Sequence, residues 1–147
     1  MASNSAKLIV LLPIQPRFAQ LIMTGKKKVE FRKVSFRKEV SHCLVYASSP
    51  IQKILGYFEL SYIDKDFPKK LWTRYKAVGG IPYEEFQTYY AYTVQGVAIG
   101  IGKVHVLRNP VSLKSLSKSL VAPQNFTYLT PDSIRPLTSP IKFGSRI

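Results

Sequence analysis

The sequence has few of the residues that build disulfides, metal centres or paired-carboxylate active sites. Among 147 residues it has one cysteine, Cys43, two histidines and eight acidic residues. A single cysteine cannot form an internal disulfide, and because Cys43 lies in an apolar run we expect it in the core. The histidines and the cysteine do not stand at metal-ligand spacing. We therefore predict no metal and no cofactor, and a hydrolase with two catalytic carboxylates is poorly supplied.

Long apolar runs are also missing. The run from Leu8 to Leu12, which ends at Pro13, is too short for a membrane span or a signal peptide, and is typical of a buried strand instead. Gly100 and Gly102 do not complete a dinucleotide fingerprint, and there is no phosphate-loop motif. We predict a soluble, cytoplasmic protein without a membrane partner.

Positive charge is what the sequence has in excess. Lys and Arg number 22 against 8 acids, which gives a net charge of +14. Such a field attracts polyanions and accelerates their encounter with the protein, and nucleic acid is the commonest partner of this kind. Because the charge is clustered, we expect RNA or a nucleotide as the partner. The alternative is that the charge serves solubility alone.

The strongest cluster is the stretch Gly-Lys-Lys-Lys-Val-Glu-Phe-Arg-Lys at residues 25–33, with five basic residues and one acid. Apolar and charged residues alternate here with period two, which predicts a strand with Val29 and Phe31 facing the core. The charged side chains that share the other face are Lys28, Glu30 and Arg32. We interpret this face as a surface that meets a charged ligand.

The rest of the chain predicts a single α+β domain. Short helical segments interrupt apolar strands, and the long strands near residues 54–63 and 95–107 contain glycines, which suggest the bends of a small closed barrel. The simplest architecture is a small β-barrel with helices inserted between strands. The predicted parts are a flexible N-terminus at residues 1–7, the domain at 8–129 and a C-terminal tail at 130–147.

The order of these segments is similar to that of a known family. A helix followed by Gly-Lys-Lys-Lys and Val-Glu-Phe-Arg resembles the hallmark of the ASCH domains, a branch of the PUA-like superfamily. The resemblance covers about residues 8–129 and implies a PUA-like β-barrel with a cleft between the barrel and the helices. The later segments that carry it are residues 46–50, 54–58, 97–101 and 122–129.

The resemblance also implies a function. Family members are mostly proposed RNA-binding modules, related barrels recognise modified bases, and a few members cleave RNA or hydrolyse an acetylated cytidine nucleoside. In the amidohydrolase a lysine follows the glycine and a threonine three residues later is the nucleophile. Lys27 matches that lysine, but Glu30 stands at the threonine position and cannot supply the hydroxyl.

We therefore expect an RNA- or nucleotide-binding module that recognises a single-stranded or modified base through a basic cleft. The first alternative is an enzyme that acts on a nucleoside or RNA with Lys27 and Glu30 as its acid–base pair. The second alternative is a protein-interaction adaptor. The candidate nucleic-acid-binding residues are Lys26, Lys27, Lys28, Glu30, Arg32, Ser48, Ser49, Lys70, Trp72 and Arg74.

Each candidate has a structural alternative. Glu30 either accepts hydrogen bonds from a base or only pairs with its basic neighbours, which at an exposed site contributes ~0–1 kcal/mol. Ser48 and Ser49 either line the cleft or belong to a solvated turn. Trp72, between Lys70 and Arg74, is either a stacking platform worth ~1–3 kcal/mol per base or a core residue.

Overall fold

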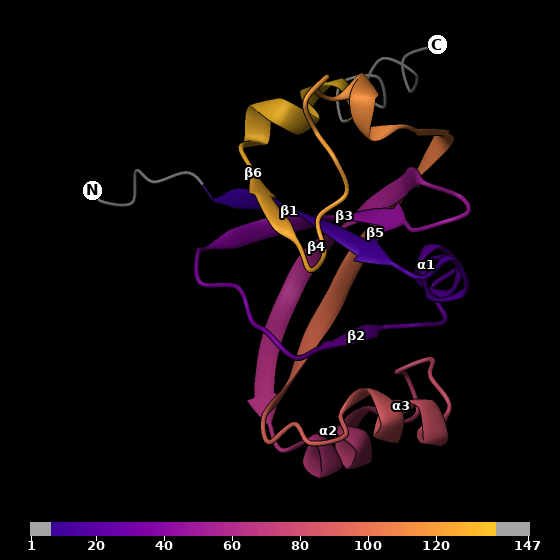
Figure 1. Ribbon diagram of the computed structural model, residues 1–147, viewed down its shortest axis with the longest axis vertical. Coiled ribbons are helices and arrows are strands. Elements are labelled where there is room, and N and C mark those ends of the chain that lie inside the picture. The colour runs from indigo at the N-terminus through magenta and orange to yellow at the C-terminus, as the bar shows by residue number, and fades with distance from the viewer. Residues whose placement is uncertain (1–6, 138–147) are drawn as a thin grey trace.

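The computed structural model describes residues 7–137, which fold into six strands, three α-helices and two 3₁₀-helices (Figure 1). The elements in chain order are β1 (Leu8–Ile14), α1 (Pro16–Met23), β2 (Val29–Arg32), β3 (Val40–Ala47), β4 (Lys53–Asp66), α2 (Pro68–Tyr75), α3 (Tyr83–Tyr89), β5 (Gly96–Val111), η2 (Leu113–Ser115), β6 (Thr127–Leu129) and η3 (Pro131–Ile134).

The described strands form one mixed sheet in the order β2-β5-β4-β3-β1-β6. Strands β1 and β3 run parallel, joined through α1 and β2, and the other neighbours are antiparallel. The prediction of an α+β fold with helices inserted between strands is confirmed. The closed barrel is not confirmed, because β2 and β6 form the two edges of the sheet and do not pair within residues 7–137.

The two long strands, β4 and β5, are neighbours in the sheet and extend further than the sequence predicts. The strand predicted near residues 54–63 continues to Asp66, which pairs with Gly96. The strand predicted near residues 95–107 continues to Val111, which pairs with Ile54. The register of this pair shifts at several points along its length.

Gly56 lies where β4 and β5 approach each other closely. A Cβ atom there would lie 2.3 Å from the backbone oxygen of His105 on the neighbouring strand. The register with β5 shifts next to it, between Ile54 and Gly56. A side chain at this position would therefore force β4 and β5 apart.

Three apolar clusters hold the layers together. On one face of the sheet, Ala19 and Ile22 of α1 pack on residues of β1, β3, β4 and β5, and the buried Cys43 lies here as predicted. On the other face a second cluster includes Leu113 and Ile134 of the two 3₁₀-helices. Figure 1 shows α2 and α3 together at one end of the molecule, where the third cluster packs them against β2 and β5.

The segment after β6 also contributes to the core. Ile134 and Leu137 are buried in the second cluster, 6% exposed each. Ile134 and Leu137 of the predicted tail therefore pack in the core, whereas residues 138–147 lie outside the described residues, as do residues 1–6 of the predicted N-terminus. The domain boundaries themselves stay a prediction.

Candidate functional site

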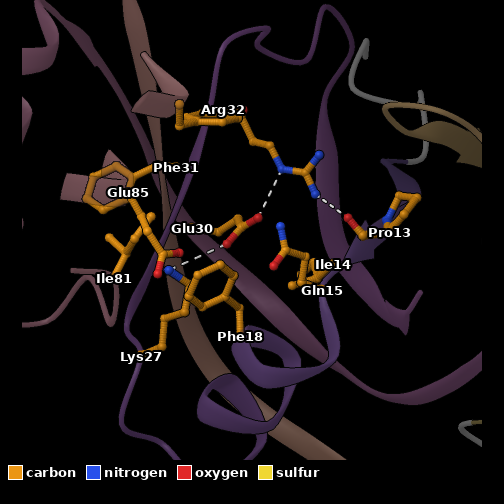
Figure 2. A pocket seen from close by; sticks show the side chains of 11 residues that line it. Pro13, Ile14, Gln15, Phe18, Lys27, Glu30, Phe31, Arg32, Ile81 and Glu85 are labelled. Atoms are coloured by element: carbon orange, nitrogen blue, oxygen red, sulfur yellow. Dashed lines mark hydrogen bonds and ion pairs between the residues drawn. The ribbon is translucent and has the colours of Figure 1, made fainter. Parts of the chain in front are cut away.

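A pocket opens where β2 meets the end of β1, α1 and α3, and we call it the β2 pocket (Figure 2). Its volume is about 220 Å³. Three charged side chains from one short stretch of sequence, Lys27, Glu30 and Arg32, point into it and form an ion-paired triad. The other lining residues are Pro13, Ile14, Gln15, Phe18, Phe31, Ile81, Glu85 and Tyr89.

The chain turn after α1 carries Lys27 into the protein. Gly25 adopts a positive φ of 82°, and the backbone N–H groups of Lys26 and Lys27 both donate to the carbonyl oxygen of Leu21. The Lys27 side chain is 2% exposed, and its ammonium donates to the backbone oxygen of Gly79. The same nitrogen lies 5.1 Å from the centre of the Phe18 ring and 3.6 Å from Glu30 Oε1.

Glu30 stands between the two cations of the triad. It pairs with Ile99 in the antiparallel ladder of β2 and β5, which fixes its backbone. Its carboxylate accepts a hydrogen bond from Arg32 Nε at 3.0 Å, while Arg32 also donates to the backbone oxygens of Pro13 and Asn125. Arg32 therefore joins β2 to the end of β1 and to the loop before β6.

Burial makes this triad electrostatically unusual. Within residues 7–137, Lys27 and Glu30 are the only polar or charged residues that are buried, and charged residues are rarely buried unless paired. Burial lowers the pKa of Lys27, and the attraction of Glu30 opposes that shift. Two cations against one carboxylate give the triad a charge of +1. Such arrangements concentrate at functional sites.

The mouth of the pocket is closed on one side by an ion pair between two helices. Arg17 of α1 donates to both carboxylate oxygens of Glu85 on α3, with 2.9 Å from Nη1 to Oε2. Both side chains are well exposed, and this hydrogen bond lowers the pKa of Glu85. The pair connects α1 and α3 at the rim.

No protein-family model matches the sequence. An ASCH domain-containing ribonuclease from Zymomonas mobilis is 26% identical over 132 residues, which are 88% of this chain and 89% of that protein. The crystal structure of ASCH from Zymomonas mobilis aligns with a TM-score of 0.82 at 26% identity, over 89% of this chain and 94% of that one. The chain belongs to the ASCH domain family.

A second relative places a similar sequence inside a larger protein. The ATP synthase subunit alpha of Ureaplasma parvum is 30% identical over 128 residues, which are 86% of this chain and 16% of that protein. The ASCH domain described here thus spans about a sixth of that relative's length, whereas it matches most of the Zymomonas protein.

The structure gathers only some of the predicted site residues of this ASCH domain into one place. Lys27, Glu30 and Arg32 share the β2 pocket, but Lys26 and Lys28 are exposed and do not line it. Lys28 directly precedes β2, and its backbone oxygen accepts from the N–H group of Ile101 on β5. Lys28 also donates its backbone N–H to Val78.

The predicted serines lie beside the end of β1. Ser48 is half-buried and its hydroxyl donates to the carbonyl oxygen of Ile14, a residue that does line the pocket. Ser49 is exposed in the turn that follows and does not line the β2 pocket. Ser48 therefore contacts a residue of the pocket wall without lining the pocket itself.

The second predicted basic group lies elsewhere, on α2. Lys70 and Arg74 are exposed and Trp72 is half-buried against the third cluster. Arg74 is paired with Asp64 and Asp66 at the end of β4. This group is separate from the β2 pocket, since none of its members lines that pocket.

Several pocket residues escape sequence reasoning. Phe18 is visible only as part of the apolar face of a helix, and Glu85 only as an acid in the first turn of another. Gln15 and Pro13 carry no signal, because their position depends on how β1 and β2 meet across β5, β4 and β3. Within residues 7–137 no group of three or more potential ligands is placed to hold a metal ion, and no helix is long and apolar enough to cross a membrane.

Proposed function

We propose that this ASCH domain binds RNA and takes a nucleotide of a single strand into the β2 pocket. The observation that carries the proposal is the triad in a protein of net charge +14, in which Lys27 and Glu30 are buried and Arg32 is largely buried. A protein that keeps three charges out of water accepts a large desolvation penalty. Buried charges of this kind concentrate at functional sites, where a polar or charged ligand can form hydrogen bonds with them.

The pocket offers distinct groups to the parts of a nucleotide. Glu30 accepts hydrogen bonds, so it suits an exocyclic amine or a ring N–H of a base. Arg32 suits a phosphate or a base edge, because its guanidinium presents five N–H donors in a planar fork. Phe18 and Tyr89 provide rings at the walls for stacking. The name of the Zymomonas relative, a ribonuclease, supports RNA as the polymer.

The test is binding of a labelled single-stranded RNA by the protein and two variants. We expect the affinity of the wild type to fall steeply with salt. Arg32→Gln should weaken binding about tenfold or more, since one bidentate contact contributes about 1–3 kcal/mol. Binding by Arg32→Gln that equals wild-type binding contradicts the proposal.

A second variant keeps the test valid if Arg32→Gln does not fold. Gln15 is exposed at the mouth of the pocket and lies outside the triad, so Gln15→Glu adds a negative charge there without changing a triad residue. Gln15 accepts from Arg17, so the new carboxylate also lies beside the ion pair of Arg17 and Glu85. We expect weaker binding from repulsion of the phosphates. The matched control is Gln20→Glu, an exposed position on α1 that does not line the pocket.

Cleavage of RNA is the second candidate, favoured by the ribonuclease name of the relative and by the lowered pKa of Lys27 beside Glu30. In one balanced route Glu30 takes the proton of a 2′-hydroxyl, whose oxygen attacks the adjacent phosphorus. The bond from phosphorus to the 5′-oxygen then breaks, and Lys27 gives a proton to that leaving oxygen. The products are a 2′,3′-cyclic phosphate and a 5′-hydroxyl.

Gel analysis and mass spectrometry of RNA incubated with the protein test this second candidate. The expected products carry cyclic phosphate ends, and Glu30→Gln should abolish them. Acetylated cytidine serves as a parallel substrate for amide hydrolysis. If neither substrate yields product at high protein concentration, binding alone remains.

A further inference from the structure

A second hollow lies between α2 and α3 and is lined largely by aromatic rings. Its volume is about 430 Å³, and we call it the aromatic groove. Helix α3 separates it from the β2 pocket, because Glu85 and Tyr89 line the pocket while other residues of α3 line the groove. The aromatic residues of the groove are Phe67, Trp72, Tyr83, Phe86 and Tyr90.

Two of these rings are open to water. Phe67 is 56% exposed and Tyr83 is 47% exposed. The Trp72 ring lies beside them, 4.9 Å from the Tyr83 ring and tilted by 46°. Below it Phe86 and Tyr90 are buried and hold the floor in place. Contiguous exposed apolar surfaces of this kind often mark binding sites.

The rim of the groove carries cations. Lys69 lines the groove and is exposed, and the Lys70 ammonium lies 5.8 Å from the centre of the Phe67 ring. The polar side chains of Gln87 and Thr93 also line it and can contact a base edge. Acidic side chains act against a polyanion. Glu84 is exposed on the neighbouring surface of α3, and Asp66 directly precedes Phe67 at the end of β4.

We infer that the aromatic groove is a second base-binding site for the same single-stranded RNA. The inference rests on the proposed RNA binding. Planar rings beside flexible cations suit the stacking of bases with contacts to the backbone, and the net charge of +14 favours a polyanion over an apolar peptide. A helix is about 10–12 Å across with its side chains, so a strand of a few nucleotides passes over α3 from the pocket to the groove.

Trp72 reports on the groove directly, because it is the one tryptophan of the sequence. The experiment titrates the full chain with short oligoadenylate and oligouridylate and follows tryptophan emission together with the anisotropy of labelled RNA. We expect emission to be quenched in step with binding. A dinucleotide, too short to reach both sites, should bind more weakly than an oligonucleotide that spans α3.

Variants of the open rings complete the test. Phe67→Ala and Tyr83→Ala should each weaken oligonucleotide binding about tenfold, with the β2 pocket untouched. The matched control is Tyr92→Asn, which removes a fully exposed ring outside the groove at a residue with φ of 64° that Asn tolerates. This control should bind as the wild type does.

The outcomes separate this inference from the proposed function. If Gln15→Glu weakens binding while the two ring variants bind normally and Trp72 emission does not change, the β2 pocket stands and the aromatic groove falls. Quenching of Trp72 by an aromatic-rich peptide but not by RNA also overturns the inference, because it identifies a protein partner. If the wild type binds no RNA, both proposals fall.

Discussion

The triad in the β2 pocket and the cluster of Arg74, Asp64 and Asp66 are built from the same chemistry in opposite environments. In the triad, the side chains of Lys27, Glu30 and Arg32 are 2%, 10% and 14% exposed. In the second cluster, which we call the α2 cluster because Arg74 lies on α2, Arg74 is 42% exposed and its two acids are 26% and 25% exposed. Both have hydrogen bonds of ordinary ion-pair length, so distance alone does not distinguish them.

Solvent decides what each cluster contributes. In the α2 cluster, water and salt screen the charges, so that the pairs contribute little to stability. In the triad, each charge has lost water and depends on its partners, so removal of one partner leaves an uncompensated buried charge. The comparison therefore predicts large effects in the β2 pocket and small effects on α2.

The largest effect is expected for Glu30→Ala. The change leaves Lys27 and Arg32 facing each other in the pocket without a counter-charge. We expect the free energy of unfolding to fall by about 3 kcal/mol, measured by urea denaturation near neutral pH. The control is Glu39→Ala, an exposed acid in the loop after β2. A loss no larger than that of the control would show that the triad is as weakly coupled as the α2 cluster.

Gly79→Ala sharpens the comparison through the backbone that supports the triad. The carbonyl oxygen of Gly79 accepts from Lys27, and a Cβ atom there would lie 2.6 Å from the Phe31 ring. Because Phe31 is packed against Phe86 in the core, we expect a loss of about 1–3 kcal/mol from overpacking. Thermal unfolding measures it. In Gly25→Asn the new Cβ meets open space and Asn tolerates the positive φ, so the midpoint should stay close to wild type.

Lys27→Met tests the buried charge by its pH dependence. Burial lowers the pKa of Lys27 in the folded protein below that of the unfolded chain. Between these two values the unfolded chain binds more protons, so this group makes stability rise with pH. The free energy of unfolding of the wild type should therefore increase relative to that of Lys27→Met as the pH rises toward about 10. The exposed Lys26→Met serves as control, and a difference that shrinks with pH contradicts the assignment.

The contrast between the clusters also shows how far sequence reasoning reaches. Local patterns predict a helix before Gly25, the strand character of residues 29–32 and the burial of Val29 and Phe31, because these depend on periodicity and chain turns. The family resemblance singles out Lys27. The same patterns cannot show that Glu30 is buried and Glu84 exposed.

The remainder depends on contacts between distant segments. The carbonyl of Gly79 comes 52 residues after Lys27, and the ion pair of Arg17 and Glu85 spans 68 residues. Aspartate is uncommon in strands, but pairing with Ala98 keeps Asp64 in β4. Tertiary contacts of this kind override local preference.

The smallest effect is expected for Arg74→Gln. The guanidinium donates to Asp64 and Asp66 at 2.6 and 2.9 Å, so one cation faces two carboxylates and the cluster has a charge of −1. We expect the urea midpoint to stay near the wild-type value, because the pair is exposed. We also expect the salt dependence of RNA binding to be unchanged, whereas Lys69→Gln at the aromatic groove should reduce its slope by about one. If Arg74→Gln reduces the slope as Lys69→Gln does, Arg74 contacts phosphate despite its two acids, and the contrast between the clusters no longer holds for binding.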